Sequence, residues 1–140
     1  MKENKIGLRK TKQRDLILKV IASAPGPVSV NEISTLLEEC EQSTGIATIY
    51  RTVNLLMDNE LIQCVRLHDA VQRYELTDIP HHHHFHCTQC DKVYDLEGCY
   101  LHLHESTLKE GHLVTSHEIT FRGLCKTCKE SLCTACKETS

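Results

Sequence analysis

Residues 81–90 combine imidazole and thiol groups at a density that neither a packed core nor a solvated surface requires. The stretch reads His-His-His-His-Phe-His-Cys-Thr-Gln-Cys and holds five of the ten histidines in the chain. Neutral imidazole and thiolate are the main nitrogen and sulfur ligands for zinc and for iron-group ions. A purification tag would sit at a terminus, whereas this run is internal and interrupted by Phe85. The stretch therefore predicts metal binding.

The histidines are predicted to serve two sites, because residues 81–87 have the character of a β-strand. Successive side chains of a strand point to opposite faces. One face would carry His81 and His83, and the other would carry His82, His84 and His86. A single strand could thus supply ligands to one metal site on each face.

Three Cys-x-x-Cys pairs accompany the histidines: Cys87 with Cys90, Cys125 with Cys128, and Cys133 with Cys136. Two such pairs supply the four thiolates of a closed, tetrahedral structural zinc site. We favour the first two pairs, because the second follows directly after a predicted strand. The third pair could replace the second, form a disulfide or remain free.

The elements that precede this stretch are predicted from hydrophobic periodicity. Helices are expected over residues 12–24, from Ser29 onward and over residues 46–59, followed by strands over residues 62–67 and 71–76. Ser29 and Glu32 form a capping-box pattern at the start of the second helix. The buried stripes would contain Leu16, Ile17, Val20, Ile21 and Ala24 on the first helix, Ile33, Leu36, Leu37 and Cys40 on the second, and Ile49, Val53 and Leu56 on the third. This order of elements predicts a winged helix-turn-helix, whose third helix would enter the DNA major groove.

Two groups of residues are candidates for DNA contact. The third helix presents Thr48, Tyr50 and Arg51 away from its buried stripe, where they could contact bases or phosphates. The basic arm at the start of the chain adds Lys10, Lys12 and Arg14. The alternatives are a helical bundle whose third helix merely has a polar face, and a solvated basic tail.

The second half of the chain is predicted to form a small α/β domain. Its expected elements are strands over residues 81–87, 93–95 and 116–122, a helix over residues 98–110 ended by Gly111, and a short helix with a loose tail after Lys126. The chain would then divide into a DNA-binding domain (1–76), a hinge (77–80) and a metal-binding dimerisation domain (81–140). The predicted fold class is α+β.

Composition agrees with a soluble, cytoplasmic protein. The sequence contains neither a long apolar run nor a signal segment at its start. Nine cysteines are an odd number, and six of them lie in the three pairs, which favours reduced thiolates over a disulfide scaffold.

These motifs together resemble the ferric uptake regulator family of bacterial metal-dependent repressors. The resemblance rests on Gly45–Arg51 (Gly-Ile-Ala-Thr-Ile-Tyr-Arg), Arg73–Leu76 (Arg-Tyr-Glu-Leu), the histidine run leading into Cys87, and residues 117–128 (His-Glu-Ile-Thr-Phe-Arg-Gly-Leu-Cys-Lys-Thr-Cys). It implies a homodimer with a winged-helix domain that binds a double-stranded DNA operator. It also implies a structural Zn²⁺ held by Cys87, Cys90, Cys125 and Cys128.

The resemblance implies two further metal sites. One falls on His81, His83, His102 and His117, where many family members have a carboxylate in place of His102 and where His104 could compete. The histidine makes this site softer and more zinc-like.

The other implied site is regulatory and falls on Glu75, His82 and His84. Iron-type members add a histidine just before the second helix, where this chain has Pro27. Cys64, His68 or water would then complete the site, although His68 could equally be a solvent-facing turn residue and Cys64 a small buried one.

The expected function is repression of metal-uptake genes, with Fe²⁺ or Zn²⁺ as the co-repressor. A peroxide-sensing regulator of the same family is the alternative, although Glu75 stands where such members carry aspartate. A metal store or chaperone would not need the winged helix. An enzyme is not expected, because neither Glu97 nor Glu118 lies in a His-Glu-x-x-His arrangement that would place a general base beside paired ligands.

Overall fold

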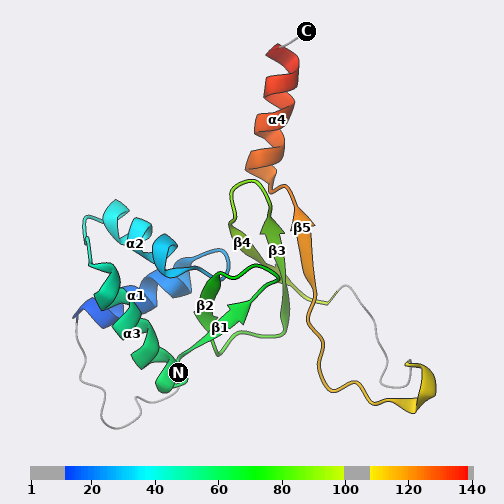
Figure 1. The fold of residues 1–140 in the computed structure, drawn as a ribbon, viewed down its shortest axis with the longest axis horizontal. Coiled ribbons are helices and arrows are strands. Elements are labelled where there is room, and N and C mark those ends of the chain that lie inside the picture. Colours follow the sequence, from blue (N-terminus) through cyan, green and yellow to red (C-terminus); the bar gives the residue numbers. More distant parts are fainter. Residues whose placement is uncertain (1–11, 100–107, 139–140) are drawn as a thin grey trace. The chain divides into compact units, whose positions relative to one another are not determined.

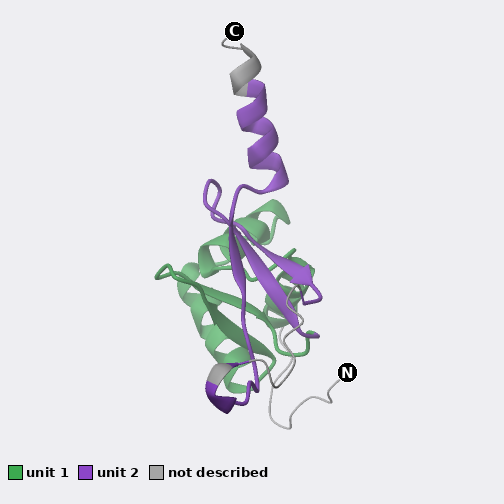
Figure 2. Cartoon of the chain, turned by 90° about the vertical axis from the view of Figure 1, so that its right-hand side faces the viewer, with its two compact units in different colours: residues 1–79 green, residues 80–140 purple. Residues whose placement is uncertain are grey.

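The computed structural model describes residues 12–99 and 108–138 of the chain. Its elements follow in the order α1 (Lys12–Ser23), α2 (Val30–Glu39), α3 (Ile46–Asp58), β1 (Ile62–Arg66), β2 (Gln72–Leu76), β3 (His82–Cys87), β4 (Val93–Glu97), a 3-10 turn (Lys109–Gly111), β5 (Thr120–Gly123) and α4 (Lys126–Glu138) (Figure 1). They form two compact units, residues 1–79 and residues 80–140 (Figure 2). The α+β fold class is confirmed.

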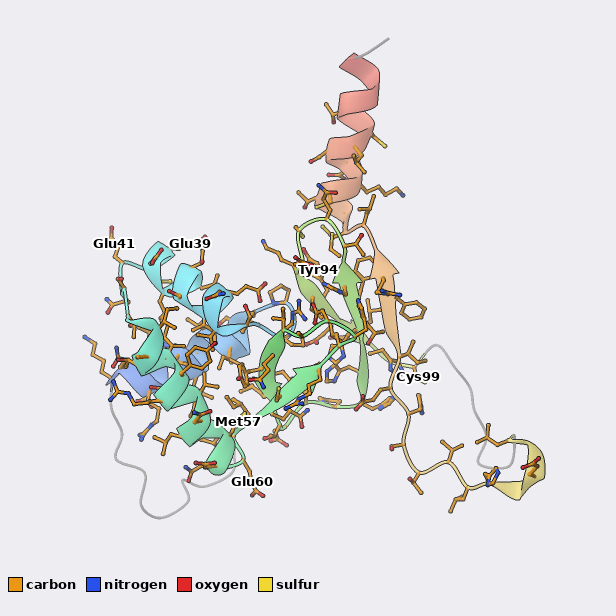
Figure 3. The ribbon with its side chains drawn as sticks, viewed as in Figure 1. Glu39, Glu41, Met57, Glu60, Tyr94 and Cys99 are labelled. Atoms are coloured by element: carbon orange, nitrogen blue, oxygen red, sulfur yellow. The ribbon has the colours of Figure 1, made fainter. Side chains whose placement is uncertain are left out.

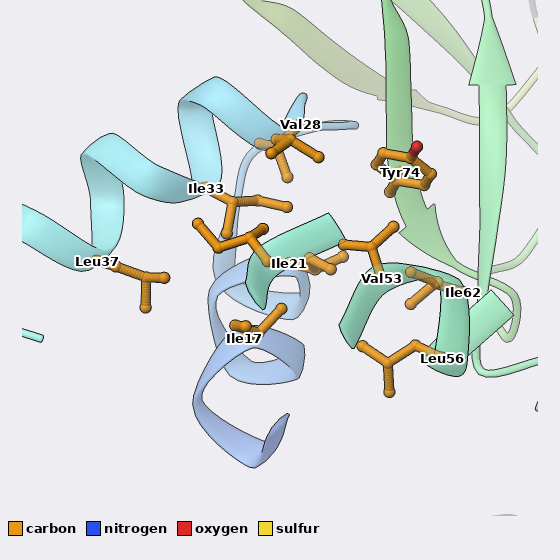
Figure 4. Close-up of a cluster of buried hydrophobic side chains, with 11 residues drawn as sticks. Ile17, Ile21, Val28, Ile33, Leu37, Val53, Leu56, Ile62 and Tyr74 are labelled. Carbon is orange, nitrogen blue, oxygen red and sulfur yellow. The ribbon is translucent and has the colours of Figure 1, made fainter. Parts of the chain in front are cut away.

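The first unit is a winged helix built around one apolar cluster. Each of the three helices contributes its predicted stripe, and side chains such as Ile17, Ile33 and Val53 are fully buried (Figure 4). The bounds of α1 and α3 agree with the prediction to within one residue at each end, and α2 begins directly after its predicted N-cap, Ser29. Cys40 is the exception, because it is the exposed C-cap residue of α2 rather than a core residue.

The wing is an antiparallel hairpin of β1 and β2 that packs on this cluster. Val28 extends the sheet by exchanging two backbone hydrogen bonds with Tyr74, at 3.0 and 2.8 Å. In the hairpin, the buried guanidinium of Arg73 donates two hydrogen bonds to the Asp69 carboxylate, at 2.9 and 3.0 Å. This paired contact fixes the turn between the two strands.

The capping box of α2 is confirmed and supports a stability prediction. The Glu32 N–H donates to Ser29 Oγ at 3.2 Å, and the Ser29 N–H donates to the Glu32 carboxylate at 2.8 Å. Replacing Ser29 by alanine should lower the free energy of unfolding by about 1 kcal/mol, because a helix N–H loses its partner. Urea unfolding followed by circular dichroism would measure this. Ser43→Ala is the matched control in an exposed loop, and equal losses for both variants would contradict the capping role.

The second unit contains a three-stranded sheet with the order β4-β3-β5. The central strand β3 is the histidine strand. It pairs antiparallel with β4, which places His84 opposite Asp95, and parallel with β5, which places Phe85 opposite Phe121. The histidines therefore lie in the middle of the sheet, with a neighbouring strand on either side.

Three predicted elements of this unit differ from the structure. The described ends of the expected 98–110 helix are not α-helical, because Gly98 has a left-handed φ of 81° and only a 3-10 turn forms at Lys109–Gly111. The predicted strand 116–122 begins only at Thr120, where pairing with β3 starts. The predicted short helix and loose tail instead form α4, a helix of 13 residues. Among the described residues, no helix is long and apolar enough to cross a membrane.

Candidate functional sites

Four cysteine sulfurs converge at the end of the sheet next to α4. Cys87 ends β3, Cys90 lies in the turn to β4, Cys125 directly precedes α4 and Cys128 lies in its first turn. Their sulfur atoms all lie within 4.8 Å of one another, and Cys90 Sγ is 4.0 Å from Cys125 Sγ. Zinc–sulfur bonds of about 2.3 Å in a tetrahedron place neighbouring sulfurs roughly 3.8 Å apart. The cluster therefore has the dimensions of a four-thiolate zinc site.

Hydrogen bonds prepare this cluster for a cation. The pKa of the Cys87 thiol is lowered to about 6, chiefly because the Cys125 N–H donates to its sulfur at 3.3 Å. The pKa of Cys125 is also lowered, first by a backbone N–H from Cys128 and then by the Tyr94 hydroxyl. Burial raises the pKa of Cys90 and brings that of Cys128 to about 12. Backbone N–H groups and the Tyr94 hydroxyl thus favour the thiolate forms of Cys87 and Cys125, which a cation would bind.

A second group of ligands lies on one face of β3. His82 Nε2 and His84 Nε2 are 3.1 Å apart, and they lie 3.6 and 3.5 Å from Asp95 Oδ1. Metal–ligand bonds of about 2.0–2.2 Å in a tetrahedron give ligand separations of roughly 3.3–3.6 Å. His82 Nδ1 contacts the Pro80 carbonyl at 2.9 Å, which orients the ring and leaves Nε2 to face the group. These three side chains could bind one divalent ion.

Three predicted partners of this group, Glu75, Cys64 and His68, belong to residues 1–79, and each is described within that unit. Glu75 lies on β2 and accepts a hydrogen bond from Gln63 Nε2 at 2.9 Å. Cys64 is half-buried against the apolar cluster, and His68 is exposed in the wing turn. Among the described residues, neither Cys64 nor His68 belongs to a group of three or more potential ligands.

The opposite face of β3 carries a third group. His81, His83 and His117 gather with their ring centroids 4.7 to 5.1 Å apart. Burial, followed by the neighbouring histidines His81 and His117, lowers the pKa of His83 and favours the neutral ring that a metal requires. The predicted fourth ligand, His102, and its competitor His104 lie outside the described residues. The sulfur of Cys99 completes the group, with all four ligand atoms within 4.8 Å of one another.

The predicted DNA contacts are only partly suited to their role. On α3, Tyr50 is 48% exposed, and Arg51 is exposed and donates to Thr48 Oγ1 at 3.3 Å. Lys12 is exposed at the start of α1, and Lys10 lies outside the described residues. Arg14, in contrast, is only 7% exposed, so it does not suit the predicted phosphate contact.

Sequence reasoning missed Asp95 and Cys99. The signal for Asp95 was available, because a hairpin turn at Cys87–Cys90 brings residues 93–97 back beside the histidine strand. Cys99 had a weaker signal, since a single cysteine outside the three pairs has no spacing to suggest a ligand role. Its position depends on the backbone turn at Gly98.

The chain is similar to several known proteins over most of its length. The ferric uptake regulator family profile matches residues 5–122. The ferric uptake regulation protein of Campylobacter upsaliensis is 32% identical over 126 residues, covering 87% of this chain and 81% of that protein. The peroxide-responsive repressor of Staphylococcus aureus strain Mu50 is 28% identical over 128 residues, covering 89% and 84%.

A solved structure shows the same fold. The ferric uptake regulator of Francisella tularensis, determined with iron, superposes with a TM-score of 0.68 at 24% identity, covering 89% of this chain and 97% of that one. The profile match, the Campylobacter relative and the shared fold lead to one conclusion: this chain belongs to the ferric uptake regulator family of metal-responsive transcription regulators.

Proposed function

We propose that the chain is a DNA-binding repressor of metal-uptake genes that binds its operator when a divalent metal is present. The observation that carries the proposal is the convergence of His82, His84 and Asp95 on one face of β3. This face belongs to the strand that directly follows the connection from the winged helix. A ligand group at that point in the chain suits a sensor better than a metal store, which has no use for a winged helix.

The proposed switch joins this group to Glu75 of the winged helix. Only residues 77–81 separate β2 from β3, so a metal held by Glu75 together with His82 and His84 would fix the angle between the two units. In a homodimer, that angle sets the spacing of the two α3 helices, which must match half-sites about one helical turn apart. Shifting the dimer from mostly lacking to mostly having the DNA-competent angle requires the metal to bind the competent state more tightly by roughly 5 kcal/mol.

The co-repressor follows from the ligand types. The imidazoles and carboxylate of the β3 group suit Fe²⁺ or Mn²⁺. The four cysteines suit structural Zn²⁺. The proposal is tested by titrating DNA fragments, selected in vitro by the metal-loaded protein, with and without Fe²⁺, Mn²⁺ or Zn²⁺. Equal DNA affinity of the metal-free and metal-loaded protein would contradict it.

Peroxide sensing is the second candidate, favoured by the similarity to the Staphylococcus aureus repressor. In a peroxide sensor, the iron-loaded form would lose DNA binding on treatment with hydrogen peroxide, whereas the manganese-loaded form would retain it. A metal sensor would respond to the concentration of metal alone. Comparing the two metal forms with and without peroxide separates these functions.

Arg51 should contribute strongly to operator binding. It is exposed on α3, one residue from the exposed Tyr50, and an arginine in the major groove can reach a guanine edge or a phosphate. Arg51→Ala is expected to cost about 1–3 kcal/mol of binding free energy, measured by fluorescence anisotropy, with unchanged metal content. Lys129→Ala removes an exposed positive charge on α4 and serves as the control. An equal loss for both variants would indicate a general charge effect.

A further inference from the structure

We infer that Cys99 is a metal ligand and that His81, His83, Cys99 and His117 form a zinc-selective site on the face of β3 opposite His82 and His84. This inference rests on the proposal that the second unit binds metal, and it specifies the chemistry of one of its sites. The site adds a sulfur ligand that none of the three Cys-x-x-Cys pairs supplies.

Geometry carries the assignment. The Cys99 sulfur lies 3.4 Å from His83 Nε2 and 3.1 Å from His117 Nε2. A tetrahedral zinc ion with bonds of about 2.0–2.1 Å to nitrogen and 2.3 Å to sulfur separates such atoms by roughly 3.5 Å. His81 lies against both histidine rings, with centroid distances of 4.7 and 4.8 Å. Three imidazoles and one thiolate therefore converge on a volume that fits one ion.

The backbone places Cys99 at this point. β4 ends at Glu97, and the left-handed φ of 81° at Gly98 turns the chain immediately before Cys99. Figure 3 shows Cys99 beyond the end of β4, at the opposite end of the sheet from Tyr94, which supports the cysteine cluster. The cysteine is thus remote from the four-thiolate cluster and available to the histidines.

The ligand sets on the two faces of β3 differ in softness. One face offers two imidazoles and the Asp95 carboxylate, while the other offers three imidazoles and a thiolate. Thiolate favours zinc, whereas carboxylate suits iron and manganese. The two faces of the strand would consequently select different ions, with zinc bound beside Cys99.

Cobalt substitution tests the sulfur ligand directly. The full-length protein, with zinc retained in the cysteine cluster, is titrated with Co²⁺, which gives a near-ultraviolet charge-transfer band only when thiolate binds it. Wild type should show the band, Cys99→Ser should lose it, and Cys133→Ser, altered at an exposed residue of α4, should keep it. Metal analysis confirms that the structural zinc has stayed in place.

Affinity and rescue complete the test. Cys99→Ser should weaken zinc binding by at least about 10-fold in competition with a chromophoric chelator, since even changes beside a ligand cost that much. Cys99→His should restore zinc affinity without the band. The assignment would be overturned if the charge-transfer band persists in Cys99→Ser. His102→Ala should keep the band, and its loss there together with persistence in Cys99→Ser would point to another ligand set. If the wild-type protein shows the charge-transfer band but no metal-dependent DNA binding, the proposed repressor function is refuted while the Cys99 site is retained.

Discussion

Replacing Cys125 by serine should remove the structural zinc and unfold the sheet of residues 80–140. The apolar cluster of eleven buried residues lies wholly in the winged helix. In the second unit, the described buried apolar residues are Cys87, Val93 and Cys125, and two of these three belong to the cysteine cluster. A unit of this size rarely gains more than about 3–5 kcal/mol from its core. Zinc binding contributes on the order of 10–16 kcal/mol in small zinc peptides, so the metal should dominate its stability.

Hydrogen exchange resolved along the chain measures the expected result. In Cys125→Ser, the amides of β3 and β4 should lose protection, while those of α1 to α3 keep theirs, and metal analysis should show the loss of one zinc per chain. Cys133→Ser is the matched control, because it makes the same atomic change at an exposed position on α4. Retention of zinc and of strand protection in Cys125→Ser would mean that the Cys133 and Cys136 pair substitutes for the predicted ligand.

The winged helix could be predicted closely because its elements depend on local rules. The apolar spacing of α1, α2 and α3 and the Ser29–Glu32 capping box are each contained within one element. The Val28 bridge was not predicted, since it pairs residues far apart in the sequence. The burial of Arg14 was not predicted for a similar reason, because it depends on how the helices pack.

The second unit was harder to predict because its order depends on contacts between distant segments. Alternation along the histidine strand separated His81 and His83 from His82 and His84, as in the structure, although His86 contacts Asp91 instead of joining a ligand group. Cysteine spacing identified four sulfurs that the structure brings together. Spacing alone could not show that β5 runs parallel to β3 or where the chain turns after β4. Cys99 depends on the turn after β4, whereas Asp95 follows from the β3–β4 hairpin, and these are the two potential ligands that sequence reasoning missed.

Replacing both His82 and His84 by alanine should abolish the metal dependence of DNA binding. The two Nε2 atoms lie 3.1 Å apart and supply two of the three converging ligand atoms on their face of β3. Without the two imidazoles, the proposed switch keeps only the carboxylates of Asp95 and Glu75 as ligands. Coupling between a metal and DNA typically amounts to about 5- to 150-fold in affinity. Wild type should show a gain in this range on metal saturation, and the double variant should show none.

Fluorescence anisotropy titrations with and without metal provide the measurement, and metal analysis should still find one structural zinc per chain. His112→Ala is the control, since this histidine is 68% exposed and lies 3.5 Å from the Glu110 carboxylate, away from the β3 group. Asp95→Asn keeps the size of the side chain but removes its charge, and it should reduce the metal response without changing metal-free DNA affinity. Because linkage is reciprocal, the selected DNA should also tighten metal binding by the wild type and not by the double variant. A metal response that persists in the double variant would show that this face of β3 is not the switch and would direct the search to the face that carries Cys99.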